Sequence, residues 1–221
     1  MPDRHAVKPG SPVRFANPAF ARSIRGLFVA TGAGLAIGIV TSVGQGSLPE
    51  ALAPLANSSA SWCLCAFVIA MVAQEPRSGA LTGFVSLVAM LAGYALAAEL
   101  LAYPAGAASM LVRWGAAAVV AGPALGVGAA WLRGSNGLRR AVGIAPVVGI
   151  LLGEGLYGLT VVAATTSVSY WTGQVAVGLA VVALAAIRLR NGPLIALMLA
   201  SSAVAGVIFY AAYTLVLGVL I

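Results

Sequence analysis

Long apolar runs recur along almost the whole sequence and restrict the fold more than any other feature. Apolar residues make up 61% of the chain and charged residues only 8%. The runs are about 15–27 residues long, close to what a helix needs to cross a bilayer. A water-soluble domain cannot bury so many of them. The sequence therefore predicts an all-α, polytopic membrane helical bundle, and 221 residues leave no room for a separate soluble domain.

We predict seven transmembrane helices, of which the second is short. They cover residues 26–44, 61–74, 79–102, 110–132, 141–164, 172–187 and 193–219. With seven spans, every lysine and arginine except Arg113 lies on the side of the N-terminus. Basic residues favour the cytoplasmic side, so we predict the N-terminus inside and the C-terminus outside. Without the second span, the arginines of residues 133–140 would lie outside.

The chain divides into two parts. Residues 1–25 form a basic cytoplasmic tail with four prolines, which we expect to be largely disordered. Within it, the residues that follow Asn17-Pro18 are typical of a short interfacial helix. Residues 26–221 form a single transmembrane helical domain. In this domain, residues 45–60 contain two prolines and form either an outer loop or a re-entrant segment.

One face of the first predicted span carries small residues. Ala30, Gly34 and Gly38 recur every four residues, which allows another helix to approach closely. Packing within the bundle is the commoner use of this spacing. Contact with a partner helix, or with a second copy of the chain, is the alternative.

Glu154 is the most informative single residue. It lies thirteen residues beyond Ala141 in the fifth predicted span, about 20 Å along a helix that rises about 1.5 Å per residue. This depth places the carboxylate within the hydrocarbon, in the outer half of the bilayer. An exposed charge there costs on the order of 3 kcal/mol. We therefore expect Glu154 to face the protein interior or water, with Tyr157, Gln174, Arg113, a cation or a proton as its partner, and its protonation state stays open.

Polar residues are concentrated in the outer half of the predicted bundle. We predict that they line an outward-facing pocket for a small molecule or an ion. The other interpretation is that they satisfy one another and bind no ligand. Glu99 and Arg113 lie at the outer ends of consecutive predicted helices that a short turn connects, so we expect an ion pair between them. The predicted ligand-binding residues are Gln45, Asn57, Trp62, Glu99, Arg113, Glu154, Tyr157 and Gln174.

The sequence argues against catalysis and against bound cofactors. The only histidine and the only aspartate are His5 and Asp3, and no carboxylate pair or His/Cys cluster lies in a predicted span. Cys63 and Cys65 point to different faces of a helix, so we expect neither a disulfide nor a metal site there. We predict no enzyme, no cofactor and no metal. The net charge of +7 sets the orientation in the membrane, so we expect no nucleic-acid partner.

Three short motifs carry a resemblance. They are Q-G-x-L-P at residues 45–49, A-N-S-x-x-x-W at 56–62, followed by A-F at 66–67, and G-E-G-x-Y at 153–157. On these motifs, residues 26–219 resemble a family of small bacterial integral-membrane proteins that has no assigned activity. The resemblance implies a multi-pass protein of the bacterial cell (plasma) membrane and no particular mechanism. The scarcity of lysine, which occurs only at Lys8, agrees with a bacterial origin.

Two functions remain. The first is a transporter, or the substrate-binding subunit of one, that binds a small molecule or ion at Glu154. The second is a structural or accessory subunit that packs against partner helices and binds no small molecule.

Overall fold

The described part of the chain is helical apart from short connections. The computed structural model describes residues 18–101 and 107–218, and no β-strand occurs within these ranges. The elements are α1 (Pro18–Ser47), the 3-10 helix η1 (Glu50–Asn57), α2 (Ser59–Ala70), α3 (Pro76–Leu100), α4 (Ala107–Arg133), α5 (Gly137–Gly143), α6 (Ala145–Thr160), α7 (Val168–Leu189) and α8 (Gly192–Gly218). Six helical segments are long and apolar enough to cross a membrane, or up to seven if the bent pair η1–α2 is one span. This confirms the predicted all-α membrane bundle.

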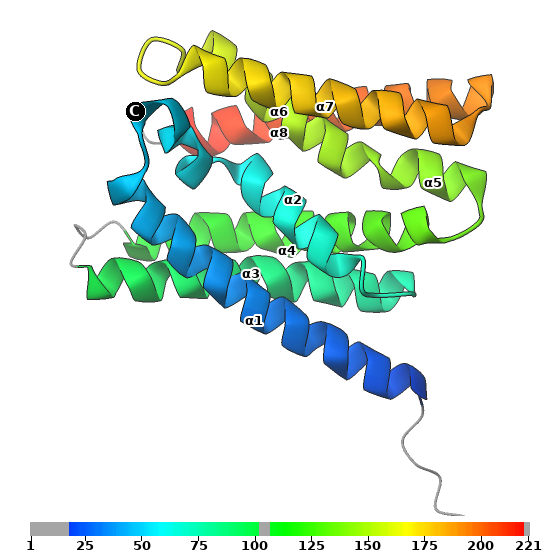
Figure 1. Ribbon diagram of the computed structural model, residues 1–221, viewed down its shortest axis with the longest axis horizontal. Coiled ribbons are helices and arrows are strands. Elements are labelled where there is room, and N and C mark those ends of the chain that lie inside the picture. The colour runs from blue at the N-terminus through cyan, green and yellow to red at the C-terminus, as the bar shows by residue number, and fades with distance from the viewer. Residues whose placement is uncertain (1–17, 102–106, 219–221) are drawn as a thin grey trace, which may run out of the picture.

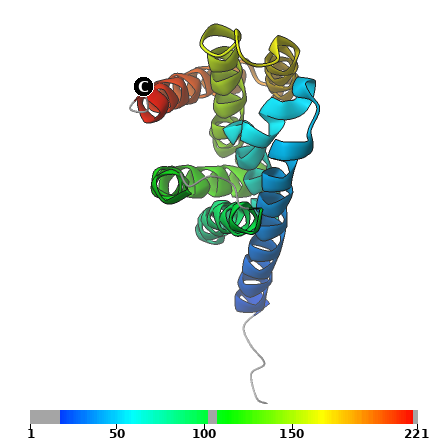
Figure 2. The same cartoon turned by 90° about the vertical axis from the view of Figure 1, so that its left-hand side faces the viewer.

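The helices form two groups with α2 between them (Figures 1 and 2). In the first group, α1 packs on α3 and α3 packs on α4. In the second group, α7 and α8 pack on α6, and α5 contacts α8. The short helix α2 contacts α3, α4 and α6, so it touches both groups. α2 therefore connects the two groups.

The second predicted span falls in a bent pair of short helices. α2 has only 12 residues, about 18 Å of helix, and its axis is bent by 58° from that of η1. Pro54 lies inside η1, and Ser58 between the two helices has extended backbone angles. The Ser58 hydroxyl accepts a hydrogen bond from the Ser61 N–H and so caps α2. Residues 45–60, which we expected to be an outer loop or a re-entrant segment, contain the end of α1, all of η1 and the start of α2. The bent pair η1–α2 has the form of a broken span or of a re-entrant loop.

Two other predicted boundaries differ from the structure. Residues from Pro18 onward belong to α1, so the predicted interfacial helix continues into the first span without a break. Residues 1–17 of the predicted tail lie outside the described residues. The fifth span is divided between α5 and α6 at Ile144, just before Pro146, which has no N–H to continue the helical hydrogen bonding. It ends at Thr160, earlier than predicted.

The small-residue face of α1 packs inside the bundle. Ala30 is fully buried, and a Cβ added to Gly38 would lie 2.0 Å from the Met90 carbonyl oxygen of α3. A Cβ on Gly34 would lie 2.7 Å from the Ser86 carbonyl oxygen of the same helix. α3 therefore covers the face that the alternative interpretation assigned to a partner helix, and internal packing is confirmed for it.

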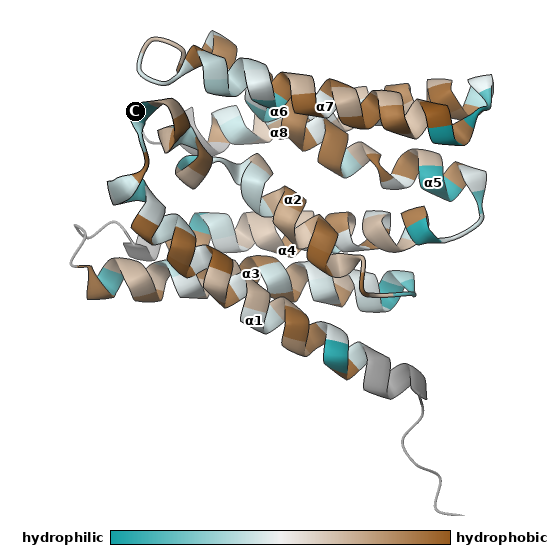
Figure 3. Ribbon diagram, viewed as in Figure 1, coloured by the Kyte–Doolittle hydropathy of each residue, from teal (hydrophilic) through white to brown (hydrophobic). Residues whose placement is uncertain are grey.

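Polar segments gather at the end of the bundle where α1 begins. Figure 3 shows hydrophilic residues at the start of α3, at the end of α4, in α5 and at the end of α7. The Arg133 guanidinium donates to the Met71 carbonyl oxygen, so the last turn of α4 lies beside the end of α2. The arginine-rich turns therefore lie at the end of the bundle where α1 begins, as expected for seven passes in alternating directions.

Single-cysteine labelling tests the orientation. Ser135 and Ser169 are both exposed, and they lie in the α4–α5 turn and at the start of α7. In a background with Cys63→Ala and Cys65→Ala, we expect a membrane-impermeant thiol reagent on intact cells to label Ser169→Cys and not Ser135→Cys. The reason is that basic turns stay in the cytoplasm. The opposite labelling pattern would invert the topology.

Candidate functional site

The Glu154 carboxylate is fully buried against the start of α2. Its Oε2 accepts hydrogen bonds from Ser58 Oγ at 2.6 Å and from the Ala60 backbone N–H at 2.9 Å. Its Oε1 accepts from the Ser59 N–H at 2.7 Å. The Gln174 side-chain amide of α7 adds a bond to Oε2 at 3.2 Å. Glu154 thus faces protein donors and not lipid, as its depth in the sequence predicted.

Helix polarity explains why a carboxylate lies at this point. The first N–H groups of a helix have no carbonyl partner within the helix, and they carry a partial positive charge that favours an anion. Inside a membrane, no water is available to satisfy them. Ser59 and Ala60 are the first two residues of α2, and Glu154, from a helix 94 positions later in the chain, accepts from both. The carboxylate therefore joins α2 to α6.

Gln174 connects α7 to Glu154 and to α6. Its Nε2 donates to the Leu151 carbonyl oxygen at 3.2 Å as well as to Glu154. Its Oε1 lies 3.3 Å from Ser58 Oγ. These hydrogen bonds reach Glu154 from the start of α2 and from α7. Gln174 was one of the partners that we expected for Glu154.

Glycines on α6 allow its neighbours to approach Glu154 closely. A Cβ on Gly158 would lie 2.0 Å from the Trp171 ring, and one on Gly155 would lie 2.7 Å from the Val175 side chain, both on α7. Gly153 faces α8, where a Cβ would lie 2.8 Å from the Gly206 carbonyl oxygen. The glycines of the G-E-G-x-Y motif thus let α7 and α8 enclose the carboxylate.

A second polar group lies next to the first one. Gln45 at the end of α1 donates to Asn57 Oδ1 at 2.7 Å and accepts from the Tyr94 hydroxyl at 2.7 Å. The Trp62 ring N–H donates to Thr41 Oγ1 at 3.2 Å, and the Trp62 ring makes an edge contact with that of Tyr94. Three of the predicted site residues are therefore together here.

The two groups are joined through consecutive residues. Asn57 belongs to the second group and Ser58 to the first. The three sequence motifs therefore meet at the break between η1 and α2, since Gln45 bonds to Asn57 and Ser58 bonds to Glu154. The resulting chain of polar contacts runs from α3 through α1 and α2 to α6 and α7.

The remaining three predicted residues lie elsewhere. The Tyr157 ring belongs to an aromatic cluster that joins α4, α6 and α8 and does not donate to Glu154. Glu99 is exposed in the last turn of α3, and Arg113 is half-buried on α4. The ion pair between Glu99 and Arg113 stays a prediction. The rings of the cluster are those of Trp114, Tyr157, Phe209, Tyr210 and Tyr213.

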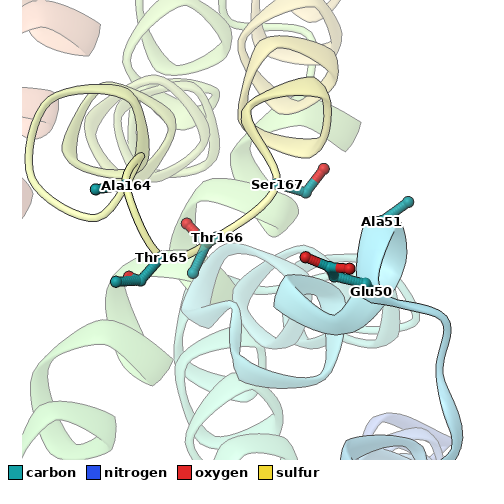
Figure 4. Close-up of a pocket in the computed structure, with 6 residues that line it drawn as sticks. All are labelled: Glu50, Ala51, Ala164, Thr165, Thr166 and Ser167. Carbon is teal, nitrogen blue, oxygen red and sulfur yellow. The ribbon is translucent and has the colours of Figure 1, made fainter.

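A cleft of about 340 Å³ opens at the end of the bundle opposite the arginine-rich turns. Figure 4 shows Glu50 on one side of it and Thr165 and Thr166 on the loop opposite. None of the eight predicted site residues lines this cleft. The other lining residues are Ala51, Ala164 and Ser167.

Two aromatic residues, Tyr170 and Trp171, lie in the first turn of α7, next to the loop that lines the cleft. The Trp171 ring N–H donates to Thr166 Oγ1 at 2.8 Å, at the lining of the cleft. The Tyr170 ring makes an edge contact with that of Trp171. Tyr213 of α8 makes an edge contact with the ring of Tyr157, three residues after Glu154 on α6.

Ser58 is the main site residue that the sequence did not identify. It precedes a helix, as capping serines do, and this position was the available signal. Its bond to Glu154 spans 96 positions in the chain, so spacing gave no indication of it. Among the residues that the structure describes, no group of three or more His, Cys, Asp or Glu side chains that could hold a metal ion is found.

Comparison with known protein families matches residues 17–219 to one family model, described as a family of unknown function (DUF6518). Neither a curated protein nor a solved structure matches the chain.

Proposed function

We propose that this chain, which belongs to the family of unknown function DUF6518, is a membrane transport protein that binds a small solute or ion at Glu154. One observation carries the proposal: a fully buried carboxylate lies at the break of a helical pair, between two groups of membrane helices. Ionisable residues inside membranes commonly mark ion and substrate pathways. In many transporters, the binding site is formed by broken helices near the middle of the membrane.

The geometry favours a ligand that competes with the α2 donors. A carboxylate offers about four lone pairs, and four donors already contact Glu154. A proton or small cation that binds there must displace some of these donors. Binding would then loosen the attachment of α2 to α6. A change at the carboxylate is therefore coupled to a movement between the two helical groups.

The cleft supplies the route from outside. A solute that enters beside Glu50 meets Thr166, which is bonded to Trp171. Gln174, three residues after Trp171 on the same helix, donates to Glu154. Movement of the start of α7 would open this route. Because Gln174 is on the same helix and bonds to Glu154, ligand binding at the carboxylate would be coupled to this movement. We place this end of the bundle outside a bacterial plasma membrane, and the proposal includes no catalytic step and no cofactor.

Flux measurements on reconstituted protein test the proposal. We would incorporate the full chain into liposomes, trap a pH-sensitive dye inside, and impose a potassium diffusion potential, with parallel assays of ²²Na⁺ and ⁸⁶Rb⁺ uptake. Melting temperatures with a panel of amino acids, sugars and vitamins would detect a solute. We expect a response in at least one assay, reduced at least about tenfold by Glu154→Gln because the substitution removes the charge that attracts the ion.

Glu75→Gln is the matched control, since Glu75 is exposed at the other end of the bundle. It should leave the response unchanged. No flux and no shift in melting temperature with any compound would overturn the proposal. Co-purification of a stoichiometric membrane partner in that case would favour the accessory-subunit function instead.

A further inference from the structure

Two turns at the basic end of the bundle contain five arginines and no carboxylate. The α4–α5 turn, residues 133–140, carries three of them, and the α7–α8 turn, residues 188–192, carries two. All five side chains are exposed. They are Arg133, Arg139, Arg140, Arg188 and Arg190. We call these residues the arginine surface.

The two turns lie side by side. A Cβ on Gly137 would lie 2.7 Å from Leu194 Cδ1, so the start of α5 touches the first turn of α8. α5 also contacts α7, whose last turn holds Arg188. Figure 3 shows hydrophilic residues on α5 and at the end of α7 at the same end of the bundle. Charges that are far apart in the sequence therefore form one surface.

Little negative charge from the described residues offsets the arginine surface. Glu75 is the only described carboxylate at this end, and it belongs to the α2–α3 connection. Arg133 and Arg140 donate to the carbonyl oxygens of Met71 and Gly134, which are neutral groups and add no negative charge. Like charges at short distance repel one another unless a counter-charge binds.

The surroundings of the arginine surface indicate what supplies the counter-charge. Leu138 lies between the arginines and is 59% exposed, and Ile187, beside Arg188, is 64% exposed. An exposed apolar side chain next to a guanidinium suits the boundary between acyl chains and headgroups. Guanidinium groups bind phosphate oxygens through two parallel hydrogen bonds.

From this juxtaposition we infer that the arginine surface binds anionic phospholipids, with the headgroup phosphates on the arginines and the acyl chains beside Leu138 and Ile187. Positive charge alone orients a membrane protein, whereas a shared surface built from two turns also selects the lipid that surrounds it. This inference does not depend on transport by Glu154.

Native mass spectrometry of the purified full chain in neutral detergent tests the inference. The probes are phosphatidylglycerol and phosphatidylcholine with the same acyl chains. We expect at least about tenfold tighter binding of phosphatidylglycerol, because each basic residue near an anionic headgroup adds to the attraction. The triple variant Arg139→Gln/Arg188→Gln/Arg190→Gln should lower this preference to less than about twofold. These three side chains were chosen because Arg133 and Arg140 also bond to the backbone.

The control is Arg25→Gln/Arg77→Gln, at the same end but outside the two turns, and it should retain the preference. A triple lysine variant of the same positions should bind with intermediate preference, since lysine keeps the charge without the planar fork. Equal binding of both lipids by the wild type would overturn the inference, as would an unchanged preference in the triple glutamine variant. Full competition by millimolar inorganic phosphate would show a free-anion site and would also overturn it. Melting temperatures in phosphatidylcholine would establish that each variant is folded.

Discussion

Glutamine in place of Glu154 is expected to lower the free energy of unfolding by about 2–4 kcal/mol, the range for breaking buried charged contacts. The amide oxygen can take only one of the two carboxylate positions. Its NH₂ group then faces another donor. At the Oε1 position this donor is the Ser59 N–H, and at the Oε2 position the donors include the Ala60 N–H. The favourable interaction of the negative charge with the start of α2 is lost as well. Relief from burying a charge offsets part of this loss.

Thermal unfolding in detergent would measure the effect of Glu154→Gln. Glu50→Gln, on an exposed residue, is the control and should change stability by less than about 0.5 kcal/mol. Ser58→Ala should cost less in the Glu154→Gln background than in the wild type, because the two side chains share a hydrogen bond. Full stability of Glu154→Gln would contradict the arrangement, since it would mean that the side chain is neutral and donates a proton.

Alanine in place of Gly38 is expected to lower the free energy of unfolding by about 1–3 kcal/mol, the usual cost of overpacking a core. The new Cβ would lie 2.0 Å from the Met90 carbonyl oxygen and 2.7 Å from the Tyr94 N–H nitrogen. These are backbone atoms of α3 and cannot rotate away, so α1 and α3 must separate. Their separation would also stretch the bond from Tyr94 to Gln45.

The matched control for Gly38→Ala is Gly32→Ala on the same helix. A Cβ at Gly32 meets no atom within 4 Å, and alanine favours the helical backbone by about 1 kcal/mol. The control should therefore be neutral or stabilising, while Gly38→Ala destabilises. Thermal unfolding of both variants in the same detergent would measure the difference. Equal melting temperatures would exclude the close packing of α1 on α3.

Gly38 and Glu154 both help to position α2, Gly38 from the first group of helices and Glu154 from the second. Gly38 sets the spacing of α1 and α3, and Gln45, seven residues later on α1, contacts Asn57 beside the broken pair. Glu154 holds the other side of the break. The position of α2 between the two helical groups therefore depends on contacts from both groups.

The class of fold and the main helices could be predicted from the apolar pattern of the sequence alone. Apolar runs long enough to cross a bilayer can be satisfied only by helices that bond their own backbone groups, so the positions of α3, α4, α7 and α8 followed closely from composition. The spacing of Gly34 and Gly38 predicted a close helix contact. The depth of Glu154 predicted a buried carboxylate with partners, because an unpartnered charge in lipid is costly.

The contacts between polar groups of different helices depend on how the helices pack and could not be predicted from the sequence. Helix order and rotation place the Ser59 and Ala60 N–H groups against Glu154, and no local pattern encodes a contact across 94 positions. The break at Ser58 followed from the same contact, since a helix can begin inside the bundle only where an acceptor satisfies its first N–H groups. Because the sequence does not show this contact, we expected the second span to be one helix, whereas the structure has a bent pair. The tertiary structure also separated Tyr157 from the polar group, because the packing of α8 on α6 provides Tyr210 and Tyr213 as neighbours for its ring.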